Sequence, residues 1–113
     1  MNDELPLLVC SFRDEDALYQ AYMPFVDNGG LFIRTNQNYS LGMQVALSVR
    51  LFNEADTFRV EGRIVWVTPK GAQGNKPTGI GIQFTDEDGH FLGGKIETYL
   101  AGLLQSTKLT DTL

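Results

Sequence analysis

Two segments in which apolar residues recur at every second position constrain the fold more than any other feature of the sequence. Their apolar residues are Val45, Leu47, Val49 and Leu51 in the first segment, and Phe58, Val60, Ile64 and Trp66, with Gly62 among them, in the second. Successive side chains of a β-strand point to opposite faces of a sheet, so this period of two predicts two strands that each bury one face. Residues 53–56 lie between the segments and predict a hairpin loop.

Three shorter apolar segments predict further strands, at residues 5–12, 31–35 and 79–84. Acidic residues 14–16 precede a short segment that we expect to form a helix or turn, since Asp caps helices and Pro24 stops them. Asn28 and the two glycines that follow it favour a turn, because these residues tolerate positive φ. Residues 69–77 are rich in Gly and predict a loop. The pattern as a whole is typical of a mainly β protein.

After Asp86 the apolar period changes from that of a strand to that of a helix. The apolar residues at helical spacing are Ile96, Tyr99, Leu100, Leu103 and Leu104. Such a stripe predicts a C-terminal helix that packs one face on the sheet. We expect residues 1–113 to form a single domain, with residues 105–113 as a frayed tail.

The charge and the cysteine content narrow the class of protein. Nine Lys and Arg stand against fourteen Asp and Glu, a net charge of −5. Phosphate backbones attract basic surfaces, so we expect no nucleic-acid partner. Apolar runs such as residues 7–10 and 31–33 are far shorter than the roughly 20 residues that span a bilayer, so we expect no insertion into a membrane. A single cysteine cannot form an internal disulfide, and no leader-like segment opens the sequence. We therefore expect a cytoplasmic protein.

No arrangement of residues in the sequence predicts catalysis, a cofactor or a metal site. His90 is the only histidine, and a nucleophilic pair with Cys10 is disfavoured because Cys10 lies in an apolar strand. The acidic residues 86–88 lack the ligand spacing of a calcium loop and are better interpreted as the first turn of the last helix. The glycine-rich loop also lacks the spacing of a phosphate-binding loop. These absences favour a binding module over an enzyme.

Several motifs in this order resemble the PilZ domain family. They lie at residues 27–33 (DNGGLFI), 39–42 (YSLG), 60–67 (VEGRIVWV) and 79–84 (GIGIQF). Residues 21–25, 69–75 and 96–102 are most similar to the single-domain members that serve type IV pilus assembly. The resemblance implies a six-stranded antiparallel β-barrel with a short N-terminal helix or turn and a C-terminal α-helix.

Most PilZ domains bind the bacterial second messenger cyclic di-GMP, but the residues that would bind it are missing here. The family uses an Arg-x-x-x-Arg segment and an Asp/Asn-x-Ser-x-x-Gly turn. With Gly30 as the last residue of that turn, Phe25 and Asp27 occupy the acidic and Ser positions. Arg13 is the only upstream arginine, and Ala17 stands four residues later. The resemblance thus implies a PilZ fold without direct cyclic di-GMP binding.

The resemblance then implies an adaptor in type IV pilus biogenesis and twitching motility. The implied partners are the pilus extension ATPase and a cyclic di-GMP-binding protein with a degenerate EAL domain. An alternative is a direct cyclic di-GMP receptor whose variant site uses strand arginines, namely Arg34, Arg50, Arg59 and Arg63. Calorimetry with the nucleotide separates the two hypotheses.

We predict that the partner surface is built from aromatic and apolar residues. The candidate partner-binding residues are Tyr19, Tyr22, Met23, Pro24 and Phe25, joined by Leu103 and Leu104 of the last helix. Rigid aromatic rings and adaptable methionines are common binding anchors. Tyr22 is the residue that we most expect to contact a partner. We expect it to be half exposed, and we expect its replacement by Ala to keep the fold. For Phe25, insertion into one end of the barrel is the favoured alternative.

Overall fold

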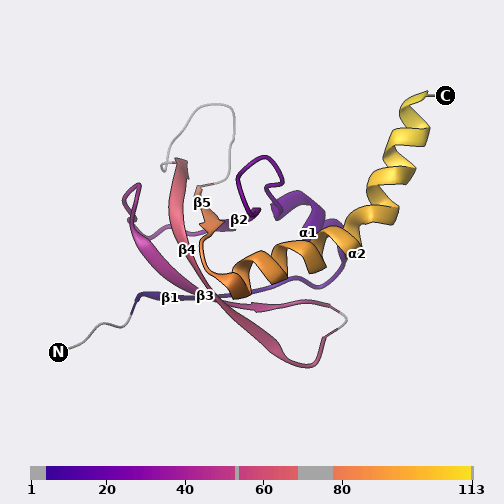
Figure 1. Cartoon of the computed structure of the whole chain (residues 1–113). Coiled ribbons are helices and arrows are strands. Elements are labelled where there is room, and N and C mark those ends of the chain that lie inside the picture. Colours follow the sequence, from indigo (N-terminus) through magenta and orange to yellow (C-terminus); the bar gives the residue numbers. More distant parts are fainter. Residues whose placement is uncertain (1–4, 53, 69–77, 113) are drawn as a thin grey trace.

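The alternating segments form one curled sheet that is covered by a long C-terminal helix (Figure 1). The computed structural model describes residues 5–52, 54–68 and 78–112, and side chains as far as residue 101. The elements in chain order are β1 (Leu7–Ser11), α1 (Glu15–Ala21), β2 (Gly30–Arg34), β3 (Gln44–Arg50), β4 (Thr57–Thr68), β5 (Gly79–Phe84) and α2 (Glu87–Thr112). Each predicted strand and helix is therefore confirmed within a few residues. The predicted loop at residues 69–77 lies outside the described residues.

The sheet does not close into the predicted barrel. The described residues form five strands in the order β1-β3-β4-β5-β2, so that β1 and β2 are the two edges. β1 pairs with β3 in parallel, whereas the other neighbouring strands pair antiparallel. Parallel strands need a long crossover connection, which α1 and β2 provide between Ser11 and Gln44. The prediction of a six-stranded, wholly antiparallel barrel is thus wrong for the part of the chain that the structure describes.

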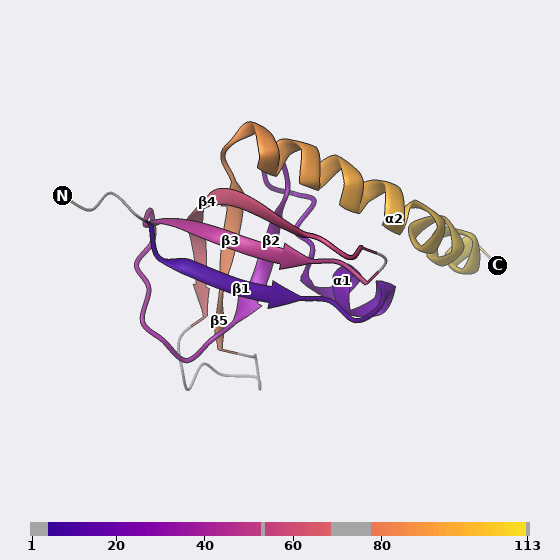
Figure 2. The same ribbon diagram turned by 90° about the horizontal axis from the view of Figure 1, so that it is seen from below.

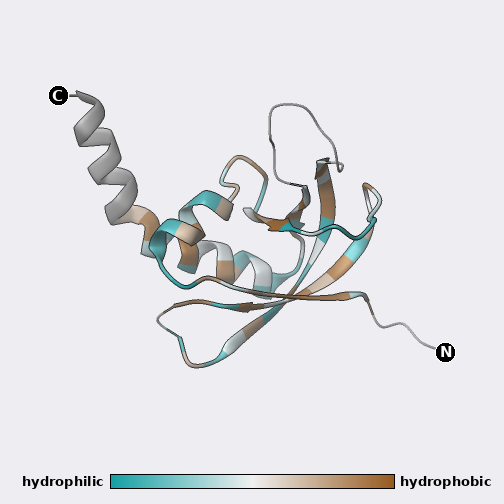
Figure 3. Ribbon diagram, turned by 180° about the vertical axis from the view of Figure 1, so that it is seen from behind, coloured by the Kyte–Doolittle hydropathy of each residue, from teal (hydrophilic) through white to brown (hydrophobic). Residues whose placement is uncertain are grey.

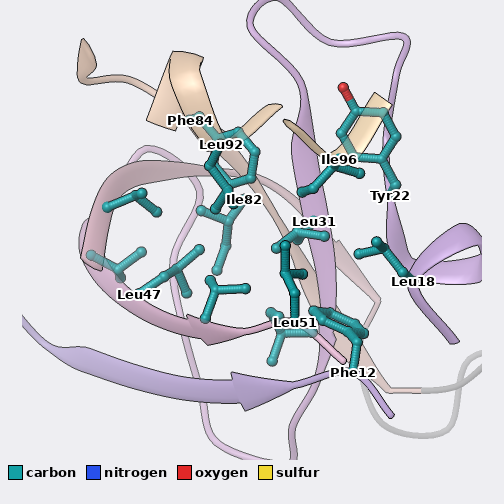
Figure 4. Close-up of a cluster of buried hydrophobic side chains, with 14 of the residues drawn as sticks. Phe12, Leu18, Tyr22, Leu31, Leu47, Leu51, Ile82, Phe84, Leu92 and Ile96 are labelled. Carbon is teal, nitrogen blue, oxygen red and sulfur yellow. The ribbon is translucent and has the colours of Figure 1, made fainter. Parts of the chain in front are cut away.

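The core lies between the concave face of the sheet and α2 (Figure 4). Strand residues with less than 2% exposure include Val45, Leu47, Val60, Ile64, Ile82 and Phe84. Leu92, Ile96 and Leu100 of α2 cover them, each at most 1% exposed. Brown apolar bands alternate with teal polar bands along the strands in Figure 3, as the period of two predicts. Each such side chain contributes roughly 1.5–3 kcal/mol of burial free energy.

The C-terminal helix begins where its predicted acidic first turn lies. The carboxylate of Asp86 accepts a hydrogen bond from the backbone N–H of Gly89 at 2.7 Å. Glu87 and Asp88 follow in the first turn, where carboxylates interact favourably with the helix dipole. The helix runs along one side of the sheet (Figure 2) and its backbone continues to Thr112. It therefore includes residues 105–112, for which the sequence predicted a frayed tail.

Candidate functional site

The segment chosen as partner surface begins with the short helix α1. Asp14 caps the helix by accepting a hydrogen bond from the backbone N–H of Ala17 at 2.8 Å. Leu18 is fully buried and holds α1 against the core. Tyr19 lies on the outer side of the helix with 39% of its surface exposed. Tyr19 is therefore accessible, and its role in partner binding stays a prediction.

Tyr22 is buried, so the prediction that it is half exposed is wrong. Directly after α1 the chain forms an isolated antiparallel bridge between Tyr22 and Leu31 of β2. The bridge turns the Tyr22 side chain toward the core, where only 8% of its surface stays exposed. Its hydroxyl donates a hydrogen bond to Glu97 of α2 at 2.6 Å. Burial first, and then the Glu97 carboxylate, raise the pKa of Tyr22 above its ordinary value. Tyr22 joins α1, β2 and α2 instead of facing a partner.

Met23 is also buried, but it lies on the outer face of the sheet. A Cβ atom added to Gly81 would lie 2.9 Å from Met23 Cε and 2.9 Å from Trp66 Cβ. Because Gly81 has no side chain, Met23 can fold down over β5 beside Trp66. Phe32 covers Gly79 in the same way, since a Cβ there would lie 2.6 Å from Phe32 Cζ. The two glycines thus form a floor for apolar side chains.

Phe32, Gly81 and Trp66 stand in register across β2, β5 and β4. The sequence pattern placed Trp66 on the buried face with Ile64, but the pairing shifts between these two residues. Such a β-bulge adds one residue and turns the following side chains over. Trp66 is consequently 53% exposed, and its indole N–H donates to the Thr68 hydroxyl at 2.8 Å. We use the name outer aromatic patch for Met23, Phe32 and Trp66 together with Phe25, which follows Met23 by two residues in the chain.

Phe25 is the most exposed large apolar residue of the structure's described part. It keeps 79% of its surface exposed, and Pro24 before it is also exposed. The alternative prediction, that Phe25 fills one end of a barrel, is therefore wrong. The side chains of Leu103 and Leu104 lie outside the described residues. Of the predicted partner surface, the structure thus leaves Tyr19, Pro24 and Phe25 accessible.

The strand arginines of the alternative hypothesis do not gather at one place. Arg34 and Arg50 line an open cleft together with Arg13. Arg59 and Arg63 lie on β4, paired in register with Ser48 and Gln44 of β3, and both are exposed. The four arginines are therefore divided between two regions of the sheet.

Cys10 and His90 belong to different surfaces. Cys10 lines the open cleft, whereas His90 lines a shallow depression on α2. Burial raises the pKa of the Cys10 thiol to about 11, which keeps it in the unreactive protonated form. His90 instead lies 3.2 Å from the side-chain oxygen of Asn28. Within the described residues, no group of three or more His, Cys, Asp or Glu could hold a metal ion.

A second polar contact holds α2 against the hairpin that joins β3 and β4. Glu54 accepts a hydrogen bond from the Tyr99 hydroxyl, and Lys95 Nζ lies 2.9 Å from Glu54 Oε2. The Phe52 and Tyr99 ring centroids are 5.4 Å apart. Tyr99 and then Lys95 lower the pKa of Glu54, because both hydrogen bonds favour the ionised carboxylate. No sequence signal marks this contact, since its residues lie far apart in the chain.

The lowered pKa of Glu54 predicts a specific loss of stability in acid. The stabilisation that comes from the ionised Glu54 carboxylate is fully present above the ordinary Glu pKa, about 4.3. It is lost as the pH falls through the lower pKa that Glu54 has in the folded state. We expect Glu54→Gln to be less stable than the parent at neutral pH and to lose less stability between neutral and acid pH. Urea unfolding at a series of pH values measures both effects. Asp56→Asn in the same hairpin is the control, and equal pH profiles for parent and Glu54→Gln would contradict the assignment.

A family comparison agrees with this architecture. The model of the PilZ domain matches residues 6–102 of the 113-residue chain. The chain therefore belongs to the PilZ domain family. No curated protein matches it. PilZ domains are in general non-catalytic binding domains, and membership indicates a cyclic di-GMP-related role as adaptor or receptor. No helix among the described residues is both long and apolar enough to cross a membrane.

Proposed function

We propose that this PilZ domain is a non-catalytic adaptor in type IV pilus biogenesis and twitching motility. In this account it links a degenerate EAL-domain protein, which binds cyclic di-GMP, to the pilus extension ATPase through protein contacts. The chain itself binds no nucleotide. The observation that carries the proposal is the exposed phenyl ring at position 25, where nucleotide-binding relatives have an Asp or Asn.

The charges around this turn support the loss of the nucleotide site. Phe25 offers no acceptor for a guanine edge, and Asp27 uses its backbone carbonyl to accept from the Gln83 side chain at 3.1 Å. The Arg13 side chain is 91% exposed and lies 3.8 Å from the Asp14 carboxylate. No second arginine stands four residues after it. A nucleotide with two phosphates would therefore find no arginine pair beside this turn.

The outer aromatic patch supports a protein partner in place of the nucleotide. Phe25 and Trp66 expose 79% and 53% of their surfaces. Aromatic residues and methionine are enriched in protein interfaces, where they supply rigid area at low entropic cost. The patch begins in the same turn that carries the ligand in nucleotide-binding PilZ domains. We infer that this region keeps a binding role while its ligand has changed.

The absence of nucleotide binding is directly testable. We expect isothermal titration calorimetry of the purified chain with cyclic di-GMP to give no heat of binding at tens of micromolar ligand. A purified PilZ domain that has both nucleotide motifs serves as the positive control in the same buffer. Micromolar binding by this chain would favour the alternative, a receptor that uses the strand arginines. In that case Arg34→Gln or Arg63→Gln would show which of the two arginine regions is used.

A further inference from the structure

The two edge strands of the described sheet, β1 and β2, flank an open cleft of about 1100 Å³. Val9 and Ser11 line it from β1, and Phe32 and Arg34 line it from β2. The short helix α1 contributes Ala17 to the walls, and the segment directly after β3 contributes Leu51. The cleft therefore lies where a barrel would need one more strand to close.

The hydrogen-bond pattern shows which backbone groups of β1 face this cleft. Pro6 accepts from the backbone N–H of Ala46 of β3 at 2.8 Å, and Phe12 donates to Arg50 at 2.9 Å. In a parallel pair the residues that bond to the neighbouring strand alternate, so the even-numbered residues of β1 face β3. Val9 and Ser11 consequently direct their backbone N–H and C=O groups toward the opposite, open side.

The same argument applies to β2. Thr35 donates to Thr78 at 3.2 Å and Gly29 accepts from Phe84 at 3.0 Å, so the odd-numbered residues of β2 face β5. The backbone N–H and C=O groups of the even-numbered residues therefore point away from β5, toward the edge of the sheet. The first of these positions is covered, because the carbonyl of Gly30 accepts from Met23 at 2.8 Å. The antiparallel bridge between Tyr22 and Leu31 also brings the segment after α1 alongside Gly30 and Phe32. Beyond this bridge, among the described residues, no strand pairs with the edge of β2 at Arg34.

The charges of the cleft are opposite to the charge of the chain. The chain has a net charge of −5, yet Arg13, Arg34 and Arg50 all line the cleft. Among the described residues, Glu54 is the one acidic residue in the lining, and its carboxylate is already bound by Tyr99 and Lys95. The aromatic rings of Phe12, Phe32 and Phe52 are also part of the lining. A ligand that fits must be acidic on one side and apolar on the other.

We propose that the cleft receives an acidic extended segment of another protein, which adds to the edge of β2 as a further strand. Alternate residues of an extended peptide point to opposite sides, so acidic side chains would meet the arginines while apolar ones face the phenylalanines. Strand addition gives affinity through backbone hydrogen bonds and specificity through side chains. The proposal goes beyond the adaptor function, and of the outer aromatic patch only Phe32 lines the cleft.

A synthetic peptide tests the proposal with the full chain. The probe has blocked ends and about six residues, a usual strand length, in which Glu alternates with Val. We expect its titration to shift the backbone amide NMR signals of Val9, Ser11 and Arg34, and to slow the hydrogen exchange of Arg34. The same peptide with Lys in place of Glu, and one with N-methyl groups on alternate amides, are both expected to leave these signals unchanged.

Two double variants with the same net charge separate the cleft from general electrostatics. We expect Arg34→Gln with Arg50→Gln to weaken binding of the acidic peptide at least about tenfold, since interfacial charge pairs contribute strongly. Arg59→Gln with Arg63→Gln on β4 should bind within about twofold of the parent, because these arginines do not line the cleft. Phe25→Ala should also bind like the parent, which keeps this test independent of the adaptor proposal.

Three results would overturn the proposal. The first is that the acidic peptide at millimolar concentration shifts none of the amide signals of residues that line the cleft. The arginines would then serve only to prevent edge-to-edge pairing with other sheets. The second is equal binding of the N-methylated peptide, which excludes strand addition. The third is a titration in which cyclic di-GMP shifts the same amides and displaces the peptide, which would make the cleft a phosphate site.

Discussion

Replacement of Tyr22 by Ala is expected to lower the free energy of unfolding by about 3–5 kcal/mol, the usual cost of deleting a large buried aromatic side chain. The Tyr22 ring is 8% exposed and lies beside Ile96 of α2 (Figure 4). The variant loses this packing, the hydrogen bond to Glu97 and the contact that joins three elements. Urea unfolding followed by circular dichroism measures the loss.

Two control variants separate packing from hydrogen bonding. Tyr22→Phe keeps the ring and removes the hydroxyl, so we expect a loss of about 1–2 kcal/mol. When the pH is raised, the free energy of unfolding of Tyr22→Phe should also fall less than that of the parent. The raised folded pKa of Tyr22 stabilises the fold below about pH 10, and this contribution is lost as the pH rises toward that folded value. Tyr19→Ala on the exposed side of α1 should change stability by less than about 0.5 kcal/mol. A Tyr22→Ala variant as stable as the parent would contradict the buried placement.

Phe25→Ala is expected to weaken partner binding by at least about 2 kcal/mol, or roughly 30-fold, without loss of stability. The side chain is 79% exposed, so little packing is lost when it is truncated. Trp66→Ala should weaken the same interaction if the outer aromatic patch acts as one surface. Surface plasmon resonance with the purified ATPase and the EAL-domain protein measures the affinities. Unfolding curves of the same preparations show that the fold is kept.

A second exposed phenylalanine, elsewhere in the structure, provides the matched control. Phe91 lies on α2 with 66% of its surface exposed, and it belongs to the depression around His90 and Lys95. We expect Phe91→Ala to bind both partners like the parent. Normal binding by Phe25→Ala and Trp66→Ala, combined with lost binding by Phe91→Ala, would place the partner surface on α2.

The secondary structure could be predicted because short-range patterns determine it. The period of two at Val45–Val49 and the helical spacing of Ile96 and Leu100 each correspond to one buried face in the structure. The acidic start of α2 and the cap at Asp14 could also be predicted from the sequence, since each depends on residues close in the chain. These features are local, so tertiary contacts did not alter them.

Sheet closure and side-chain direction could not be predicted, because they depend on contacts between distant residues. The parallel pairing of β1 with β3 follows from the path of the whole connection between them. A single shift between Ile64 and Trp66 turns Trp66 outward, and a bridge to Leu31 turns Tyr22 inward. One residue of register exchanges the two faces of a strand. The sequence indicated aromatic residues next to the turn, but Tyr22, the one it favoured, is buried, whereas Phe25 is exposed. A binding role for Phe25 stays a prediction.

Assembly of the three purified proteins tests the adaptor function most directly. Size-exclusion chromatography with light scattering would be run on the ATPase and the EAL-domain protein, with and without this chain, in the presence of cyclic di-GMP. We predict a complex of all three proteins when the parent chain is present, and separate ATPase and EAL-domain peaks when it is absent or replaced by Phe25→Ala. Co-elution of the two partners without the chain, or failure of the chain to join them, would contradict the account.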